Sequence, residues 1–277
     1  MSRLPDWLIK RTPKLENIKK MRPFLNGVHT VCEEAKCPNI GECFSCGTVT
    51  FMILGDVCTR NCGFCGVTKG EPGPVDVDEP RHVAKAAKKL GLKYVVITSV
   101  TRDDLPDGGA SHFAGTVKEL RSLSSALKVE LLIPDFNGSL EALKTVIDSK
   151  PDVINHNVEM VPRLYSSIRP SSSYERTLEV LRNIKKIEPR MTSKSGFMLG
   201  LGETEDEVRD LLKELKSCGC DVVTIGQYLS PSQYNVKVVE YVRPEKFDEY
   251  RDLGLSLGIK KVFSGPFVRS SYKAGEY

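Results

Sequence analysis

Short apolar runs recur along the chain from Thr48 onward, and each is separated from the next by a longer stretch of mixed polarity. Most of these runs are rich in Val, Ile and Phe and show no alternation of polar and apolar residues. Such runs are typical of strands that are buried on both faces of a parallel sheet. We therefore predict strands at 48–54, 94–100, 129–136, 153–159, 195–201 and 222–229, with a shorter one at 262–267.

The stretches between these runs carry helix signals. Pro80 stands at a first-turn position, and Gly91 can end the helix that follows it. Thr204 and Glu207 have the spacing of a capping box. Further helices are expected at 173–187, where the apolar residues share one face, and at 244–258.

Six strand–helix units in sequence predict a parallel α/β fold. A closed barrel of eight such units typically needs about 250 residues, and about 230 follow residue 47 in this chain. We therefore expect an open, partial (β/α)6 barrel of the TIM type over 48–260. An N-terminal extension (1–47) precedes it and a short C-terminal segment (261–277) follows it.

The composition, 40% hydrophobic and 27% charged over 277 residues, is ordinary for a soluble globular protein. No apolar run approaches the roughly 18 residues that span a bilayer. The first 25 residues are basic and interrupted by prolines, so we predict neither a secretory signal nor a membrane association. We find no dense basic patch interleaved with aromatic residues, and expect no nucleic-acid partner.

The net charge of +4 is concentrated at the N-terminus. Residues 1–31 contain seven Lys or Arg against Asp6 and Glu16, which leaves the rest of the chain about neutral. A basic arm of this kind can steer an acidic partner toward the protein. A solvated N-terminal extension is the alternative interpretation.

Nine cysteines are many for a chain of this type, and seven of them lie between Cys32 and Cys65. An odd, clustered number argues against a secreted disulfide framework and favours metal or redox chemistry in a reducing cytoplasm. The remaining two, Cys218 and Cys220, lie at a predicted helix end and are interpreted as packing residues.

Cys58, Cys62 and Cys65 form a C-x3-C-x2-C pattern directly after the first predicted strand, with Phe64 before the last cysteine. Four thiolates normally complete an iron–sulfur cube, so three leave one iron with an open position. A zinc site would require a fourth ligand nearby, and the loop offers none. Three free thiols at this spacing would invite oxidation.

In this setting, the pattern resembles that of the radical S-adenosylmethionine superfamily. The resemblance implies that the open iron binds the amino and carboxylate groups of S-adenosylmethionine. An electron from the cluster then breaks the sulfonium bond and yields a 5′-deoxyadenosyl radical.

A second trio, Cys32, Cys37 and Cys43, precedes the first at gaps of four and five. Together the two trios resemble those of the lipoyl synthase family, and the resemblance runs from about Leu4 to Tyr272. Segments that carry it lie at 95–113, 129–136, 151–165, 194–208, 224–232 and 264–272, the last with the motif Arg-Ser-Ser-Tyr.

The resemblance implies a second, auxiliary [4Fe–4S] cluster on Cys32, Cys37 and Cys43, with its fourth iron bound by Ser271. An oxygen ligand matches iron less well than a thiolate, which suits a cluster that is dismantled. The chain departs from the family at Cys46, which forms C-x-x-C with Cys43 and is either a competing ligand or a bystander. A four-cysteine zinc knuckle is the remaining alternative.

Polar residues and glycines follow several predicted strands, where parallel α/β folds build their sites. We expect contacts with S-adenosylmethionine from these residues: Ser99, Asp103, Asn155, Asn157, Glu159, Gly200 and Gly202. Gly108 and Gly109 are glycines at which the backbone can approach the cofactor. His29 and His112 are interpreted as structural.

The resemblance implies an enzyme that inserts two sulfur atoms at C6 and C8 of an octanoyl chain. A lysine of a carrier domain, such as the glycine cleavage H protein or a 2-oxoacid dehydrogenase subunit, holds that chain. Each hydrogen is removed by one 5′-deoxyadenosyl radical, and the auxiliary cluster supplies both sulfurs. A ferredoxin or flavodoxin is the expected electron donor, and we expect a cytoplasmic monomer.

Two other functions are compatible with parts of the pattern. A biotin synthase-like enzyme also inserts sulfur by radical chemistry, but it lacks the upstream trio and the Arg-Ser-Ser-Tyr ending. An iron–sulfur scaffold or electron carrier would leave the polar strand ends unexplained. Reductive cleavage of S-adenosylmethionine separates the enzymes from the carrier.

Overall fold

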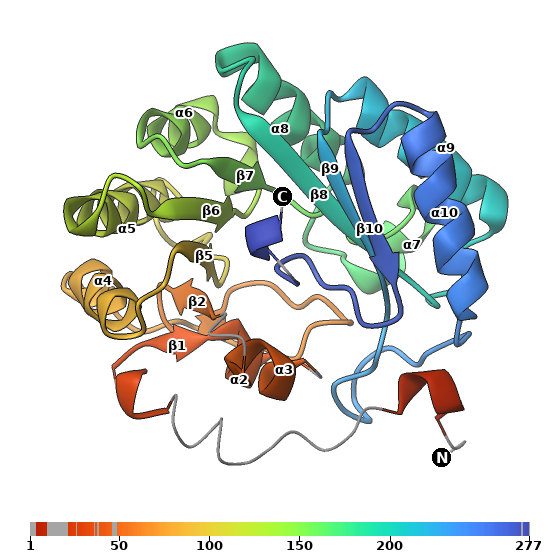
Figure 1. The fold of residues 1–277 in the computed structure, drawn as a ribbon, viewed down its shortest axis with the longest axis horizontal. Helices are drawn as coiled ribbons and strands as arrows, with labels where there is room; N and C mark the ends of the chain where they lie inside the picture. Colours follow the sequence, from red (N-terminus) through yellow and green to blue (C-terminus); the bar gives the residue numbers. More distant parts are fainter. Residues whose placement is uncertain are drawn as a thin grey trace.

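The computed structural model describes residues 4–9, 22–25, 27–35, 37, 39–45, 49–272 and 274–276. Its main feature is one eight-stranded sheet, curved into a partial barrel (Figure 1). In sheet order the strands are β1 (His29–Thr30), β2 (Thr50–Ile53), β5 (Tyr94–Ser99), β6 (Lys128–Leu132), β7 (Val153–Asn155), β8 (Thr192–Leu199), β9 (Val222–Gln227) and β10 (Lys261–Gly265).

From β2 to β10 all neighbouring strands are parallel, and only β1 pairs antiparallel, with His29 opposite Met52. Among the described residues β1 and β10 do not pair, so the barrel is open between them. The expected partial barrel is therefore confirmed.

Helices cover the outer face of the sheet (Figure 1). They are α4 (Glu79–Lys89), α5 (Ala110–Leu123), α6 (Leu140–Asp148), α7 (Pro162–Ile168), α8 (Tyr174–Ile187), α9 (Glu205–Ser217) and α10 (Pro244–Ser256). One strand and at least one helix alternate six times from β2 to α10, as predicted. None of the helices in the described part of the chain is long and apolar enough to span a bilayer.

The predicted helix starts are confirmed. Pro80 lies in the first turn of α4, and Thr204 and Glu207 form a capping box in which each side chain accepts from the other residue's backbone. The inward face of α8 buries Leu178, Leu181 and Ile184. Burying one such side chain contributes roughly 1.5–3 kcal/mol, so these faces hold the helices against the sheet.

Most strands end one or two residues before the predicted runs do, and two of them end four residues earlier. β6 stops at Leu132 and β7 at Asn155, rather than at residues 136 and 159. Phe136 and Glu159 have positive φ angles of 47° and 68°, so the backbone turns away from the extended conformation there. These turns place the residues after each strand at the mouth of the barrel.

The N-terminal extension contains η1 (Asp6–Leu8), η2 (Arg22–Phe24), α2 (Val31–Glu34) and α3 (Ile40–Ser45), and the C-terminal segment ends in η4 (Ala274–Glu276). The C-terminal segment runs back from β10 into the barrel, where η4 contacts β5 (Figure 1). Asn39 donates to the Phe267 carbonyl at 2.7 Å, so the two ends of the chain contact each other.

Candidate functional site

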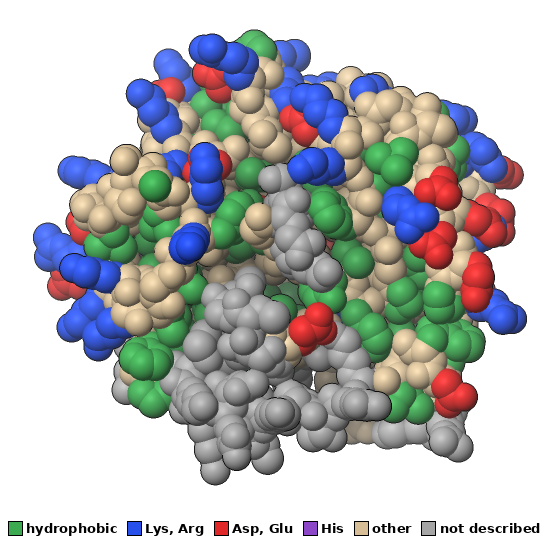
Figure 2. Space-filling view, viewed as in Figure 1, with side chains coloured by type: hydrophobic (Ala, Val, Ile, Leu, Met, Phe, Trp, Pro, Cys, Tyr) green, Lys and Arg blue, Asp and Glu red, His purple; other side chains and the backbone are tan. Residues whose placement is uncertain are grey.

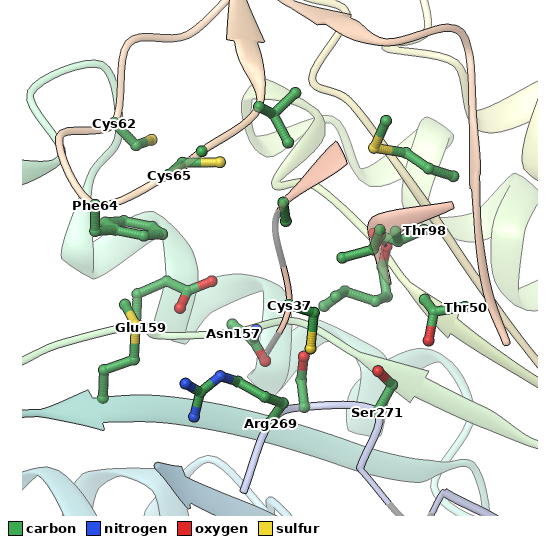
Figure 3. A pocket seen from close by; sticks show the side chains of 18 of the residues that line it. Cys37, Thr50, Cys62, Phe64, Cys65, Thr98, Asn157, Glu159, Arg269 and Ser271 are labelled. Carbon is green, nitrogen blue, oxygen red and sulfur yellow. Dashed lines mark hydrogen bonds between the residues drawn. The ribbon is translucent and has the colours of Figure 1, made fainter. Parts of the chain in front are cut away.

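A cavity of about 470 Å³ lies at the carboxyl ends of the strands. All six cysteines of the two trios line it, although they come from different segments. Ser271 of the C-terminal segment lines the same cavity. In Figure 3, Cys62 and Cys65 lie on one side of the cavity, with Cys37 and Ser271 on another. The fold therefore brings together the two sets of cysteines that the sequence separated.

Cys58 of the first trio ends the short strand β3 (Val57–Cys58), and Cys62 and Cys65 lie on the loop that leads from it to the parallel strand β4 (Thr68–Lys69). The second half of this loop is fixed by bonds from other segments. Gly63 donates its backbone N–H to the Ile168 carbonyl at 2.7 Å, and Asn235 donates to the Cys65 carbonyl at 2.9 Å. Phe64 points toward the cavity (Figure 3).

The eight cysteines in the described part of the chain are all free thiols. Burial raises the pKa of Cys65 to about 11. Burial also raises the pKa of Cys62, and the positive charge of Arg169 partly offsets that increase. A bound metal compensates the charge of such a thiol and holds it as the thiolate. The first trio therefore has the donor chemistry of an iron–sulfur site.

The second trio belongs to the N-terminal extension. Cys32 lies in α2, whose N-cap Thr30 accepts from the Glu33 backbone, and Cys43 lies in α3. Burial raises the pKa of Cys32 to about 11. Cys46, the possible competing ligand, lies outside the described residues.

Arg269 of the Arg-Ser-Ser-Tyr motif is partly buried beside Cys37, and desolvation lowers the pKa of its guanidinium. Its Nη1 donates to the Val268 carbonyl at 2.7 Å. In Figure 3 Arg269, Ser271 and Cys37 lie close together in the view.

The positions of the six cysteines around the cavity indicate which kind of metal group they could hold. No three His, Cys, Asp or Glu side chains of the described ranges converge closely enough to hold a single ion. A tetrahedral zinc site requires sulfur ligands about 2.3 Å from one ion. Trios of thiols spread around a cavity suit a cluster whose separate irons each take one ligand.

Several buried polar atoms on the cavity wall have no hydrogen-bond partner among the described residues. They are Ser99 Oγ, His156 Nε2, Asn157 Oδ1 and Arg169 Nε. Buried polar atoms are normally paired, so four unpaired ones around one cavity indicate a polar ligand. Glu159 adds a carboxyl group on the same wall, and burial raises its pKa.

His156 is held in one orientation within this wall. Its Nδ1 lies 2.8 Å from the Ile133 carbonyl oxygen and, bearing hydrogen, donates to it. Burial lowers the pKa of His156 to about 4, so the ring is neutral at pH 7 and its Nε2 is an acceptor.

Ser99, Asn157 and Glu159 thus lie where the sequence predicted, whereas four other expected residues do not line the cavity. Asp103 is ion-paired with Arg60 at 2.8 Å. Asn155 donates to Glu130 at 3.4 Å, inside the barrel. The other two, Gly200 and Gly202, are at a turn with φ angles of 95° and 102°.

Gly200 and Gly109 allow close packing rather than exposure to the cavity. A Cβ on Gly200 would lie 2.2 Å from Gln227 Nε2, and one on Gly109 would lie 2.2 Å from Leu54 Cδ1. Gly108 similarly faces Phe136.

The histidines and cysteines that were interpreted as structural have local partners. His112 pairs with buried Glu79 at 2.7 Å and His29 with Glu34 at 3.3 Å. Cys218 and Cys220 are buried in the hydrophobic core, which confirms them as packing residues.

Arg169 and Arg269 were not predicted as site residues. Arg269 lies within the Arg-Ser-Ser-Tyr motif, and that motif was a usable signal. Arg169 follows α7 and precedes Pro170. Nothing in its local sequence distinguishes it from a surface arginine, because its burial depends on contacts with distant segments.

Comparison with known proteins identifies relatives over nearly the whole chain. The family model of the radical SAM superfamily matches residues 52–227. "Lipoyl synthase" of Caldanaerobacter subterraneus subsp. tengcongensis is 56% identical over 274 residues, covering 98% of this chain and 96% of the relative. "Lipoyl synthase" of Alkaliphilus metalliredigens is 50% identical over 278 residues, covering 100% of this chain and 96% of the relative.

Solved structures show the same fold at low sequence identity. Methylornithine synthase superposes with a TM-score of 0.55 at 15% identity, covering 78% of this chain and 71% of that one. Coproporphyrinogen III oxidase of Escherichia coli gives a TM-score of 0.52 at 14% identity, covering 75% and 52%. These similarities concern the fold alone.

Proposed function

Since the chain belongs to the lipoyl synthase family, we propose that the cavity is where it inserts sulfur into an octanoyl chain. The reaction adds two sulfur atoms, at C6 and C8, and yields the lipoyl group. The observation that carries the proposal is that both cysteine trios and Ser271 line one cavity. A radical enzyme with a sulfur donor must bring both groups to one substrate, and a single cavity meets that requirement.

A [4Fe–4S] cluster and S-adenosylmethionine follow from membership of the radical S-adenosylmethionine superfamily. We assign that cluster to Cys58, Cys62 and Cys65 of the barrel (48–260). We assign a second cluster, the sulfur donor, to Cys32, Cys37 and Cys43 of the extension (1–47), with Ser271 of the C-terminal segment (261–277) as its fourth ligand. The free thiols on the cavity wall support both assignments.

The unpaired polar atoms of the wall support a site for S-adenosylmethionine. Ser99, Asn157 and Glu159 are the contacts we favour, because they line the cavity. Asp103, Asn155, Gly200 and Gly202 do not line the cavity, and we assign them no direct contact with S-adenosylmethionine. His156 and Arg169 complete the polar wall.

C6 and C8 of an octanoyl chain are unactivated, and no side-chain base removes a proton from such carbons. When bound, the cluster and S-adenosylmethionine supply the carbon-centred radical needed to take hydrogen from them. The protein's own part is to orient the chain and exclude water. Met52, Leu132, Ile133 and Met198 give the cavity wall the apolar character that an alkyl chain requires.

The substrate is an octanoylated carrier domain, such as the glycine cleavage H protein or a 2-oxoacid dehydrogenase subunit. A ferredoxin or flavodoxin is the proposed electron donor, and the protein is proposed to act as a cytoplasmic monomer. Lys10, Arg11 and Lys14, three of the basic residues proposed to steer the carrier, lie outside the described residues. This steering requires that the carrier domain be acidic.

Anaerobic reconstitution tests the proposal. The protein should hold about eight irons, and with S-adenosylmethionine and a reductant it should convert an octanoylated carrier domain into the lipoyl form, measured by mass. Replacing Cys58, Cys62 and Cys65 together with alanine should leave about four irons and abolish cleavage of S-adenosylmethionine. About four irons in the unaltered protein, or cleavage without any lipoyl product, would contradict the proposal.

A further inference from the structure

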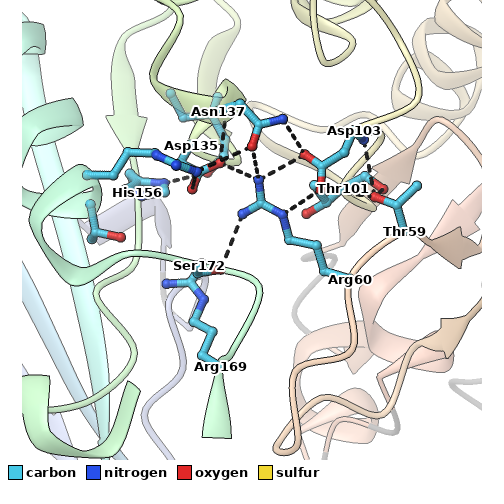
Figure 4. Close-up of polar contacts among 12 residues, drawn as sticks. Thr59, Arg60, Thr101, Asp103, Asp135, Asn137, His156, Arg169 and Ser172 are labelled. Carbon is cyan, nitrogen blue, oxygen red and sulfur yellow. Dashed lines mark hydrogen bonds and ion pairs between the residues drawn. The ribbon is translucent and has the colours of Figure 1, made fainter. Parts of the chain in front are cut away.

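Arg60 lies between the first two cysteines of the barrel trio and points away from the cavity into a buried polar network. Its side chain is only 4% exposed. Nε donates to Asp103 at 2.8 Å, and Nη2 donates to the same carboxylate at 2.9 Å (Figure 4). Nη2 also donates to Asp135 at 2.6 Å and to Asn137 at 3.0 Å, and Nη1 donates to Ser172 at 3.2 Å.

The partners of Arg60 come from three different segments. Asp103 follows β5, Asp135 follows β6, and Ser172 lies between α7 and α8. Arg176 of α8 adds a second cation, 3.4 Å from Asp135. Two guanidinium groups therefore face two carboxylates, and the burial of Asp135, which is 1% exposed, is compensated.

The same β5 loop also contacts Cys58 directly. Cys58 Sγ accepts from the backbone N–H of Thr101 at 3.4 Å and from that of Arg60 at 3.5 Å. Thr59 donates both its backbone N–H and its hydroxyl to the Thr101 carbonyl, at 3.1 and 2.9 Å. The first half of the cysteine loop is thus fixed to β5, whereas Ile168 and Asn235 hold the second half.

We infer that Arg60 is a positioning residue that fixes the separation of Cys58 and Cys62 by tying the loop between them to three other segments. The inference rests on the assignment of the first trio to the radical cluster. A guanidinium suits this role because its planar set of donors satisfies several acceptors in fixed directions, whereas a lysine offers one compact ammonium. Residues that orient metal ligands typically change metal affinity by about 10- to 100-fold when replaced.

The test compares Arg60→Lys with the unaltered protein after full reconstitution. Iron release to an added chelator is followed together with the EPR signal of the reduced protein, with and without S-adenosylmethionine. Arg60→Lys keeps the charge but loses the planar set of donors, so iron from the first trio should leave about 10- to 100-fold faster. The change in EPR signal on adding S-adenosylmethionine should shrink in parallel, while iron at the second trio leaves at its usual rate.

Arg121→Lys is the matched control. Arg121 is likewise tied to other segments, since it donates to the Leu127 carbonyl before β6 and to the Lys150 carbonyl and Asp152 before β7. These partners precede β6 and β7, at the end of the barrel opposite the cavity. Its replacement should lower the melting temperature about as much as Arg60→Lys, with no change in iron release or in the EPR signal.

Unchanged iron release in Arg60→Lys would overturn the inference. Equally faster release from both trios would also overturn it, because that result would indicate general destabilisation. If Arg60→Lys does not fold, Asp103→Asn is measured instead, because it keeps the arginine and removes one charged partner. Unchanged iron release from the first trio in Asp103→Asn would then overturn the inference. Failure of the proposed function is distinguishable from failure of this inference, because it would leave the unaltered protein with an iron content of about four.

Discussion

The phenol of Tyr272 donates a 2.7 Å hydrogen bond to Glu42 Oε1, which ties the C-terminal segment to α3 of the N-terminal extension. Tyr272 adjoins Ser271, and Glu42 adjoins Cys43. The bond therefore links two residues that each stand next to a proposed ligand of the second cluster. Its position makes the geometry of that site dependent on both ends of the chain.

Tyr272→Phe removes this bond and leaves the ring. One hydrogen bond contributes about 1 kcal/mol, so sulfur insertion should fall by roughly fivefold if that energy is used to position Ser271. Cleavage of S-adenosylmethionine should not change, because the first trio is untouched. Lipoyl product and 5′-deoxyadenosine are measured together, with Tyr234→Phe, at a side chain that is 90% exposed, as the control. Normal lipoyl formation in Tyr272→Phe would contradict the role given to the bond.

Gly226 of β9 lies directly under the C-terminal segment. A Cβ at this position would stand 2.1 Å from the Val268 carbonyl oxygen, too close for any real contact. Gly226→Ala should therefore displace the segment that carries Ser271, and the reconstituted protein should lose iron from the second trio, toward about four irons in all. Iron content and S-adenosylmethionine cleavage are the measurements.

Gly115→Ala is the matched control for that change. Gly115 lies in α5, where a Cβ would meet its nearest atom, Pro80 Cγ, at 3.9 Å. Alanine there should keep both clusters and stabilise the helix by roughly 0.5–1 kcal/mol. Full iron content in Gly226→Ala would show that the segment does not depend on this close approach.

The barrel was predictable from the sequence because its signals are local. Apolar runs, Pro80 and the Thr204 capping box each act within a few residues, and the structure confirms the strands and helices that they predict. The ends of β6 and β7 were not predictable in this way, since the runs reach Phe136 and Glu159, beyond the residues at which the two strands end.

The cysteines that line the cavity were predictable because their spacing is dense and unusual. The polar residues Ser99, Asn157 and Glu159 were predictable because side chains at the strand ends of parallel folds face the site. Asp103 shows where this reasoning fails. It follows a strand as the others do, but a buried cation, Arg60, from a distant loop takes its carboxylate. Partners of that kind are set by tertiary structure, and the local sequence pattern of a strand does not indicate them.

The neutral state of His156 predicts a pH effect on stability. Its pKa is about 4 in the folded protein, because burial disfavours the charged ring, against about 6.5 when unfolded. Below pH 6.5 the unfolded chain takes up a proton that the folded one does not. The free energy of unfolding should therefore fall between pH 6.5 and 4, by about 3 kcal/mol from this residue.

His156→Asn isolates that contribution, because asparagine can still donate to the Ile133 carbonyl but does not titrate. Unfolding by denaturant is measured at pH 7 and at pH 4.5 for both proteins, and the difference between them should narrow or reverse at the lower pH. His82→Asn, at an exposed histidine, is the control. A difference that stays constant with pH would show that His156 is not held neutral by the fold.

Ser271 and Cys46 are the two candidates for the fourth ligand of the second cluster, and variants at both separate them. Ser271 lines the cavity with Cys32, Cys37 and Cys43. The proposed reaction requires this cluster to give up sulfide, which favours an oxygen ligand that binds iron less tightly than a thiolate. Ser271→Ala should therefore keep S-adenosylmethionine cleavage and lose most sulfur insertion, whereas Cys46→Ala should change neither.

Ser271→Cys provides the sharpest contrast, because it changes only the ligand atom. A thiolate at this position should hold the second cluster more tightly, so iron content stays near eight while the lipoyl product of a single turnover falls. The measurement is lipoyl product per enzyme, with 5′-deoxyadenosine counted alongside to show that the first cluster still works. Near-normal product from Ser271→Ala, together with lost product in Cys46→Ala, would instead assign the ligand to Cys46.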